Sequence, residues 1–239
     1  MHAGGSASAT VVCVHGAGGG GWEWAIWARV LAAYGFGVLA PDLSPVAAGL
    51  AETRFADYRA QVAAWCRAAD APCVVVGASL GGLLALAVAG EVDAAALVLV
   101  NPMPCAGVPP VRAGHAHAGV VRWGRGRTLA GTRRALPDAD DAARLHALRR
   151  WRDESGAVLD EAGAGIAVAP PGCPVLVLAS GRDTDVPPAT SRALAMRFDA
   201  DFELVVQASH VGPLLGRSAA TVAERAADWL RERLAARAV

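Results

Sequence analysis

Residues 73–82 read CVVVGASLGG and place a serine between an apolar run and a helix-length segment. The run CVVV is typical of a buried strand, and the LLALAVAG that follows is typical of a buried helix. Between them, Ser79 stands in Gly-x-Ser-x-Gly spacing, where bulky residues two positions from the serine would collide. A chance Gly/Ser turn is the alternative, and the further glycine at Gly82 argues against it. The stretch predicts a sharp strand-to-helix turn that exposes the Ser79 hydroxyl.

The rest of the chain alternates short apolar runs with helix-length segments. The runs are rich in Val and Leu and continuous, as expected where both faces of a parallel sheet are covered. We expect strands at residues 10–14, 37–40, 73–76, 96–100, 174–179 and 202–206, and helices at 23–33, 55–69, 80–90, 188–197 and 213–236. This alternation predicts an α/β fold with a doubly wound, mostly parallel sheet of about six strands.

One segment breaks the alternation. Residues 101–168 contain no clear strand pattern and are rich in proline, glycine and arginine. Within them, DADDAARLHALRRWR at 138–152 is typical of an amphipathic helix with an acidic first turn, which suits the helix dipole. Because this length exceeds that of an ordinary loop, we interpret residues 103–168 as a small helical cap inserted into one domain that spans 1–239.

Composition excludes some classes of function. Of the 239 residues, 54% are hydrophobic, which is too many for a disordered chain. The 22 basic residues balance 22 acidic ones, so the net charge does not indicate nucleic-acid binding. The uncharged stretch 71–90 contains Pro72 and a central GASLGG, which argues against a membrane span. The N-terminus has no secretory signal pattern, and five unpaired cysteines favour a reducing cytoplasm.

A serine hydroxyl needs a general base to act as a nucleophile. His210, in QASHVGPLL, follows the last expected strand and precedes the last helix, where such a base should lie. An acid that orients the imidazole is offered by SGRDTDVPP, which contains Asp183 and Asp185. Asp183, four residues before Pro187, is the first choice and Asp185 the alternative. We therefore predict catalytic roles for Ser79, His210 and Asp183.

The other histidines fit that role less well. His2 lies at the terminus, and His146 is expected on the surface of a cap helix. His115 and His117 form an isolated His-x-His without a third ligand, so we expect no metal site. His15 is expected to brace the loop that it begins.

A glycine-rich loop follows the first strand, in HGAGGGG at residues 15–21. When Ser79 attacks a carbonyl, the resulting oxyanion needs N–H donors already aimed at it. One donor is the backbone N–H of Leu80, and the other must come from this loop, with Ala17 as the first choice and Gly18 as the alternative. A phosphate-binding loop is less consistent, because no Gly-Lys-Ser/Thr follows.

Together these motifs resemble the α/β-hydrolase superfamily. Within it, the chain looks most like the small carboxylesterases and hydroxynitrile lyases related to plant methylesterases. The resemblance rests on HGAGGGGWEW at 15–24, APDL at 40–43, GASLGG at 77–82, DTDVP at 183–187 and SHVG at 209–212. It covers the sheet, fades in the cap, and implies that the first two strands of the full superfamily sheet are absent. It also implies a triad of Ser79, Asp183 and His210.

Three departures from this group narrow the expected chemistry. Ala78 stands where the family often has histidine before the nucleophile, which alters the shape of the pocket. Gly16 and Val211 occupy positions where the hydroxynitrile lyases use threonine and lysine, and this chain has no lysine. These differences argue against cyanohydrin cleavage.

The leading hypothesis is a hydrolase that cleaves an ester or thioester without a cofactor. A non-hydrolytic use of the same site (cyclisation, elimination or a lyase reaction) and a small-molecule receptor are the alternatives. Gly18, Trp22, Trp123 and Trp151 are candidates for substrate binding, although the tryptophans could equally pack the cap onto the sheet. An excess of arginine in the cap suits a carboxylate, a coenzyme A tail or an acyl carrier protein, or simply a solvated surface. The oligomeric state is left open.

Overall fold

A parallel six-stranded sheet forms the centre of the molecule, in the order β2-β1-β3-β4-β7-β8. The computed structural model describes residues 9–70, 72–109 and 116–237. The strands are β1 (Thr10–Val14), β2 (Gly37–Leu39), β3 (Cys73–Ala78), β4 (Ala96–Val100), β7 (Val175–Ser180) and β8 (Asp201–Val205). The predicted fold class and the approximate positions of all six strands are confirmed.

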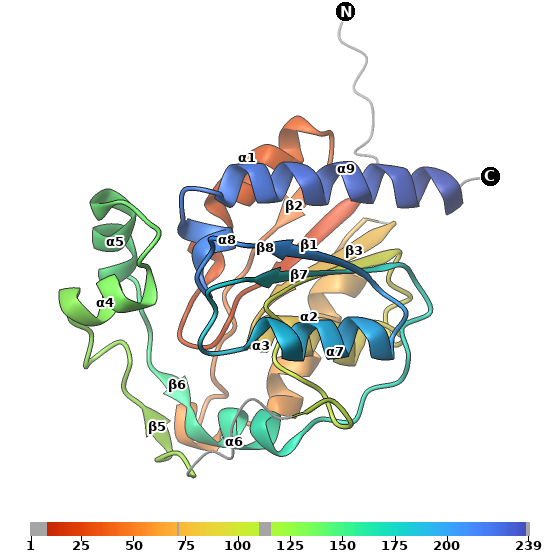
Figure 1. Cartoon of the computed structure of the whole chain (residues 1–239). Coiled ribbons are helices and arrows are strands. Elements are labelled where there is room, and N and C mark those ends of the chain that lie inside the picture. The colour runs from red at the N-terminus through yellow and green to blue at the C-terminus, as the bar shows by residue number, and fades with distance from the viewer. Residues whose placement is uncertain (1–8, 71, 110–115, 238–239) are drawn as a thin grey trace, which may run out of the picture.

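Helices cover both faces of this sheet (Figure 1). On one face lie α1 (Ala25–Ala33) and α9 (Ala219–Arg237), and on the other lie α2 (Phe55–Ala68), α3 (Leu80–Val88) and α7 (Pro188–Arg197). Successive strand residues point to opposite faces, so Val12 and Val75 join one core while Val11 and Val74 join the other. Covering both faces explains why the central strands are apolar at almost every position.

The order of the strands places two loops side by side. The chain crosses from β1 to β2 and then returns to β3 on the other side of β1. The direction in which successive strands are added to the sheet therefore reverses at β1. The ends of β1 and β3 are in register, with Val14 paired to Gly77. Open α/β sheets bind ligands at this topological switch point, outside the carboxyl ends of the strands. The glycine-rich loop after β1 and the serine turn after β3 therefore meet.

The segment between β4 and β7 contains more structure than the sequence predicted. It holds β5 (Val120–Val121), α4 (Leu129–Ala135), α5 (Asp141–Leu148), β6 (Glu154–Ser155) and α6 (Gly156–Ala164). The expectation of no strand here was wrong, because β5 and β6 pair in an antiparallel two-stranded sheet. Each strand has only two residues, which is too few for a hydrophobic pattern to predict it from the sequence.

Several helix boundaries also differ from the prediction. The helix expected at 138–152 is α5, which begins after Asp140, whose side chain caps the Ala143 N–H. The last helix is broken into α8 (Gly212–Leu215) and α9, because the chain turns at Gly216. The first helix is preceded by a 3-10 turn, η1 (Gly21–Trp24), and a second such turn, η2 (Leu50–Glu52), precedes α2.

Residues 72–90 form β3, the serine turn and α3, as expected for the uncharged stretch. Across the part of the chain that is described, no helix is both long and apolar enough to cross a membrane.

Candidate active site

Ser79 lies in the tight turn between β3 and α3. Its backbone has φ 52° and ψ −118°, a region that non-glycine residues rarely occupy. The Ser79 N–H donates to the Val100 carbonyl (2.9 Å), and the Met103 N–H donates to the Ser79 carbonyl (3.0 Å). A Cβ at Gly77 would overlap the Gly81 carbonyl, which explains the glycines on either side of the serine. The predicted turn is present and is held by bonds from the end of β4.

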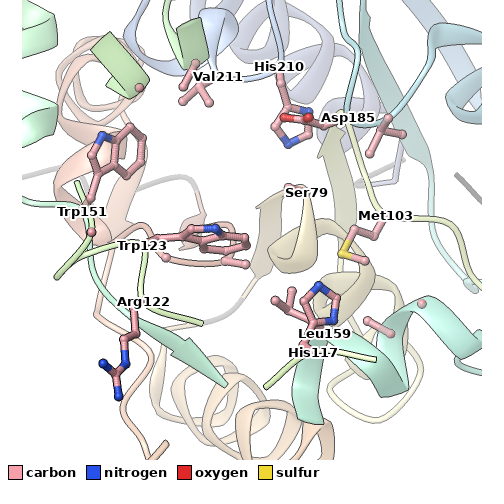
Figure 2. A pocket seen from close by; sticks show the side chains of 18 of the residues that line it. Ser79, Met103, His117, Arg122, Trp123, Trp151, Leu159, Asp185, His210 and Val211 are labelled. Atoms are coloured by element: carbon pink, nitrogen blue, oxygen red, sulfur yellow. The ribbon is translucent and has the colours of Figure 1, made fainter. Parts of the chain in front are cut away.

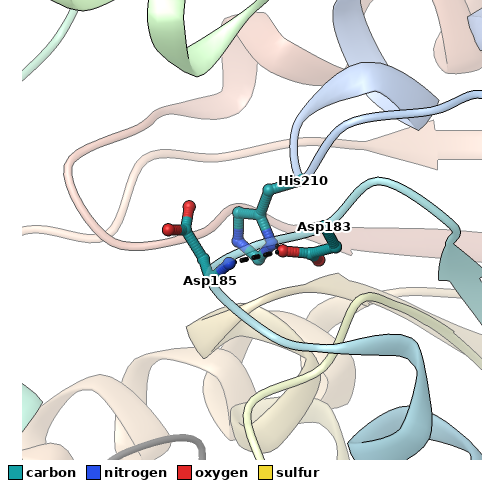
Figure 3. Close-up of side chains that lie close together, drawn as sticks. All are labelled: Asp183, Asp185 and His210. Atoms are coloured by element: carbon teal, nitrogen blue, oxygen red, sulfur yellow. Dashed lines mark hydrogen bonds and ion pairs between the residues drawn. The ribbon is translucent and has the colours of Figure 1, made fainter.

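His210 and Asp183 form a directly bonded pair (Figure 3). The His210 Nδ1 atom lies 2.6 Å from Asp183 Oδ2, and the Asp183 side chain is fully buried. The other oxygen, Asp183 Oδ1, accepts hydrogen bonds from the N–H groups of Asp185 (2.8 Å) and Val186 (2.9 Å). Asp185, the alternative acid, makes no such bond to the ring among the described contacts. The structure therefore brings Asp183 to the imidazole.

The environment of His210 has opposing effects on its pKa. Burial lowers the pKa, whereas the hydrogen bond and the negative charge of Asp183 raise it, with smaller contributions from Asp185 and Glu23. The net result is a pKa above the usual value for histidine. A raised pKa makes the ring a stronger base and stabilises the imidazolium that forms during proton transfer.

The two candidate oxyanion donors of the glycine-rich loop differ in availability. The Gly18 N–H already donates to the buried carboxylate of Glu154 in β6, at 3.0 Å. The Ala17 N–H has no partner within the described ranges. Leu80 begins α3, and the first N–H groups of a helix have no partner inside it. Ala17 and Leu80 thus each have an amide with no hydrogen-bond partner within the described residues.

Close approach explains why this loop lacks side chains. A Cβ at Gly16 would lie 3.2 Å from the Ser79 Cβ, so a larger residue would crowd the serine. Gly18 has φ +68°, and a Cβ there would lie 2.7 Å from the Trp123 ring. A Cβ at Gly19 would overlap the carboxyl of Glu23. The glycines let the loop pack against the serine on one side and a buried acid on the other.

Three other histidines lie within the described residues: His15 in the glycine-rich loop, His146 at the surface and His117 in the lining of the cavity in front of Ser79. His15 is buried, its Nε2 accepts from the Leu43 N–H (2.9 Å), and its Nδ1 lies 2.8 Å from the Gly16 carbonyl. Burial lowers the pKa of His15 to about 4, so the ring is neutral and braces the loop. His146 is exposed, and His117 pairs with Asp160 at 2.6 Å. His115 lies outside the described residues.

A cavity of about 1150 Å³ opens in front of Ser79 and His210 (Figure 2). Gly18, Trp123 and Trp151, three of the residues expected to bind substrate, line it. The fourth, Trp22, is not among its lining residues. Its ring packs edge-on against Trp151 (5.4 Å between centroids) and His146 (5.5 Å), inside the cap.

Asn101 is a site residue that sequence reasoning overlooked. It follows β4 and is almost fully buried. Its Nδ2 donates to Ser180 Oγ (2.9 Å) and to the His210 carbonyl (2.7 Å), while its Oδ1 accepts from the Ser180 N–H (2.7 Å). The residue ties two strand ends to the loop that carries the histidine. A polar residue directly after a buried strand was the signal available in the sequence.

Asp138 provides a second, unexpected anchor for the histidine loop. Its two carboxylate oxygens accept from the N–H (2.8 Å) and the hydroxyl (2.6 Å) of Ser209, the residue before His210. Because Asp138 lies in the segment between β4 and β7, that segment helps to position the histidine. No motif marks this contact, since it joins residues far apart in the sequence.

Asp183, Asp185 and His210 could also bring ligand atoms within 4.8 Å of one another. However, His210 Nδ1 and Asp183 Oδ2 bond each other, and Asp183 Oδ1 accepts two backbone N–H groups. His210 Nδ1 and both Asp183 oxygens are therefore already engaged, whereas His210 Nε2 is not engaged among the described contacts.

A comparison with protein-family models matches residues 11–225 to the Alpha/beta hydrolase family. The chain is an α/β-hydrolase. A search of curated protein sequences found no match to it. The expected resemblance to this superfamily is confirmed over most of the chain.

Solved structures similar to this α/β-hydrolase include several esterases. A pyrethroid hydrolase from Sphingobium faniae is 22% identical, with a TM-score of 0.70 and coverage of 96% of this chain and 98% of that one. A methylesterase from Arabidopsis is 15% identical, with a TM-score of 0.70 and coverage of 92% and 99%. Polyneuridine aldehyde esterase is 18% identical, with a TM-score of 0.70 and coverage of 92% and 99%. At these identities the likeness establishes the shared fold.

We expect Asn101→Ala to destabilise the enzyme by about 2 kcal/mol or more, because it leaves buried partners on Ser180 and His210 unsatisfied. Urea unfolding measures the effect. Ser191→Ala is the matched control: its buried hydroxyl has no partner within the described structure, so we expect a change of about 0.5 kcal/mol or less. Equal stability of the two variants would contradict the anchoring role of Asn101.

Proposed function

We propose that this α/β-hydrolase cleaves carboxylic esters through an acyl-enzyme formed on Ser79. The observation that carries the proposal is the Asp183–His210 pair, because its imidazole lines the same cavity as the serine at the strand-to-helix turn. The similarity to solved esterases supports an ester as the substrate. Asp183, rather than Asp185, is the proposed acid of the triad.

In the proposed reaction, His210 Nε2 takes the proton of Ser79 as its Oγ attacks the carbonyl carbon of the ester. The carbonyl oxygen becomes an anion, which the N–H groups of Ala17 and Leu80 stabilise. His210 then donates the proton to the leaving alcohol, and water releases the acyl group. Ser79 and His210 are not hydrogen-bonded among the described contacts, and such bonds commonly tighten when substrate binds.

The cavity supports a bulky, partly aromatic or apolar acyl or alcohol group. Trp123 and Trp151 line one side of it, and Met103 and Leu159 line another (Figure 2). A thioester is the second candidate, because Arg122, Arg127 and Arg134 also line the cavity and suit the phosphates of coenzyme A or a carrier protein. Analysis of the reaction products distinguishes hydrolysis of an ester or a thioester from a non-hydrolytic reaction.

The five cysteines are all free thiols, four of them buried. Free thiols persist in reducing compartments, so we propose the cytoplasm as the location of the enzyme.

We expect a chromogenic p-nitrophenyl ester to give a burst of nitrophenolate, one per active site, followed by slower turnover. Ser79→Ala should abolish both phases, because no acyl-enzyme can form. Stopped-flow absorbance measures the burst, and circular dichroism checks that the variant is folded. Hydrolysis that survives this substitution at the wild-type rate would reject the proposal.

We expect kcat/KM to rise as the pH rises through the pKa of His210, because only the neutral ring can accept the serine proton. In the wild type, Asp183 keeps this midpoint above the usual histidine value. Asp183→Asn removes the negative charge, so the midpoint should move to lower pH and the plateau should fall by about 10³-fold or more. A pH–rate profile with an unchanged midpoint would contradict the assignment of Asp183.

A further inference from the structure

A second carboxyl, that of Glu23, lies buried next to the proposed triad. Glu23 belongs to η1 and is 4% exposed. Its Oε2 atom is fully buried and has no hydrogen-bond partner among the described residues. Buried polar groups are normally hydrogen-bonded, so an unpartnered carboxyl oxygen requires an explanation. The absence of a side chain at Gly19 leaves the space that this carboxyl occupies.

Glu23 lines a small cavity that shares Ala17, Ser79 and His210 with the lining of the large one. This cavity has a volume of about 60 Å³, and its lining includes Glu23, Ser79 and His210 together with Ala17 and Gly16. That volume is sufficient for at least one water molecule, and the carboxyl, the hydroxyl and the imidazole supply the polar partners that a buried water needs. The cavity therefore places a water site within reach of both the nucleophile and the base.

Burial raises the pKa of Glu23 to about 8, although backbone hydrogen bonds from Gly20 and Gly16 and two positive charges lower it. These charges are His210, from the loop before α8, and Arg152, from the inserted segment, which itself pairs with Asp42. A protonated carboxyl both donates and accepts hydrogen bonds, as holding a water requires.

We propose that Glu23 is a positioning residue for deacylation, which holds the attacking water in the small cavity between Ser79 and His210. This inference rests on the proposed acyl-enzyme. It concerns the second half of the reaction, because only that half uses an attacking water.

The proposed step transfers one proton and exchanges one bond at the acyl carbon. The water oxygen attacks that carbon while His210 Nε2 accepts a water proton. The tetrahedral intermediate then breaks its bond to Ser79 Oγ, and His210 returns the proton to that oxygen. The products are the free carboxylic acid and the serine hydroxyl, and Glu23 ends with the proton that it began with.

A carbamate substrate separates the two halves, because carbamoyl-serine releases its group slowly. With p-nitrophenyl dimethylcarbamate, nitrophenolate release measures the first half and recovery of esterase activity measures the second. We expect Glu23→Leu to slow recovery about 10-fold or more while changing nitrophenolate release less than about 3-fold. Glu23→Gln, which keeps a neutral donor and acceptor, should stay within about 3-fold of the wild type in both.

Glu154→Gln is the matched control. Glu154 is also a buried carboxyl bonded to the glycine-rich loop, but it does not line the small cavity. If Glu23 merely braced the loop, its variants would behave like Glu154→Gln and slow both halves together. Recovery of Glu23→Leu at the wild-type rate, or an equal loss in both halves, overturns the assignment. Nitrophenolate release that persists in Ser79→Ala instead contradicts the proposed function.

A pH profile keeps the inference testable if Glu23→Leu does not fold. We expect the wild-type recovery rate to fall above about pH 8, because ionised Glu23 no longer donates a hydrogen bond to the water. Glu23→Gln has no proton to lose there and should lack this decline. Identical profiles for the wild type and Glu23→Gln would overturn the proposal.

Discussion

The site depends on the close contact between the start of α3 and the end of β1. A Cβ at Gly81 would overlap the carbonyl oxygens of Val14 and His15, so only glycine permits this approach. The contact places the first amide of α3 beside the loop that follows β1. Ser79 directly precedes this amide and has a strained backbone conformation at the top of the turn. Two parallel strands in register, Val14 beside Gly77, make this geometry possible.

Two buried carboxyls near one imidazole have different environments and, in our account, different tasks. Asp183 accepts hydrogen bonds from His210 and from two backbone N–H groups, so its negative charge is well satisfied. Glu23 Oε2 has no partner within the described residues, and burial raises the Glu23 pKa. Environments that separate two acids in this way commonly assign them separate roles in catalysis. Asn101, after β4, and Asp138, in the segment between β4 and β7, both hold the histidine loop.

The sequence was most informative where structure is local. The six strands and the serine turn follow from apolar runs and glycine spacing, and both are present. The sequence left open the choice between Ala17 and Gly18 as a donor and between Asp183 and Asp185 as the acid. Contacts across the fold favour Ala17 and Asp183. The Gly18 amide is engaged by Glu154, and the His210 ring bonds Asp183. Such partners lie far apart in the chain, so no spacing rule could reveal them.

The same reasoning explains what was missed. The two-residue strands β5 and β6 are too short to show a period, and each depends on pairing with the other. Trp22 was a candidate for substrate binding or for packing, and its ring packs against Trp151. An aromatic residue close to a site in sequence can face the substrate or pack against the protein, because its orientation depends on contacts with residues distant in the chain.

The central claim is that His210 activates Ser79 as the nucleophile. Labelling of the whole enzyme with a fluorophosphonate, followed by peptide mass spectrometry, tests this claim most directly, because the reagent modifies activated serines. We expect a single adduct, on Ser79, and strongly slowed labelling in His210→Ala. An adduct on another serine, or labelling of Ser79 at the same rate without His210, would contradict the account.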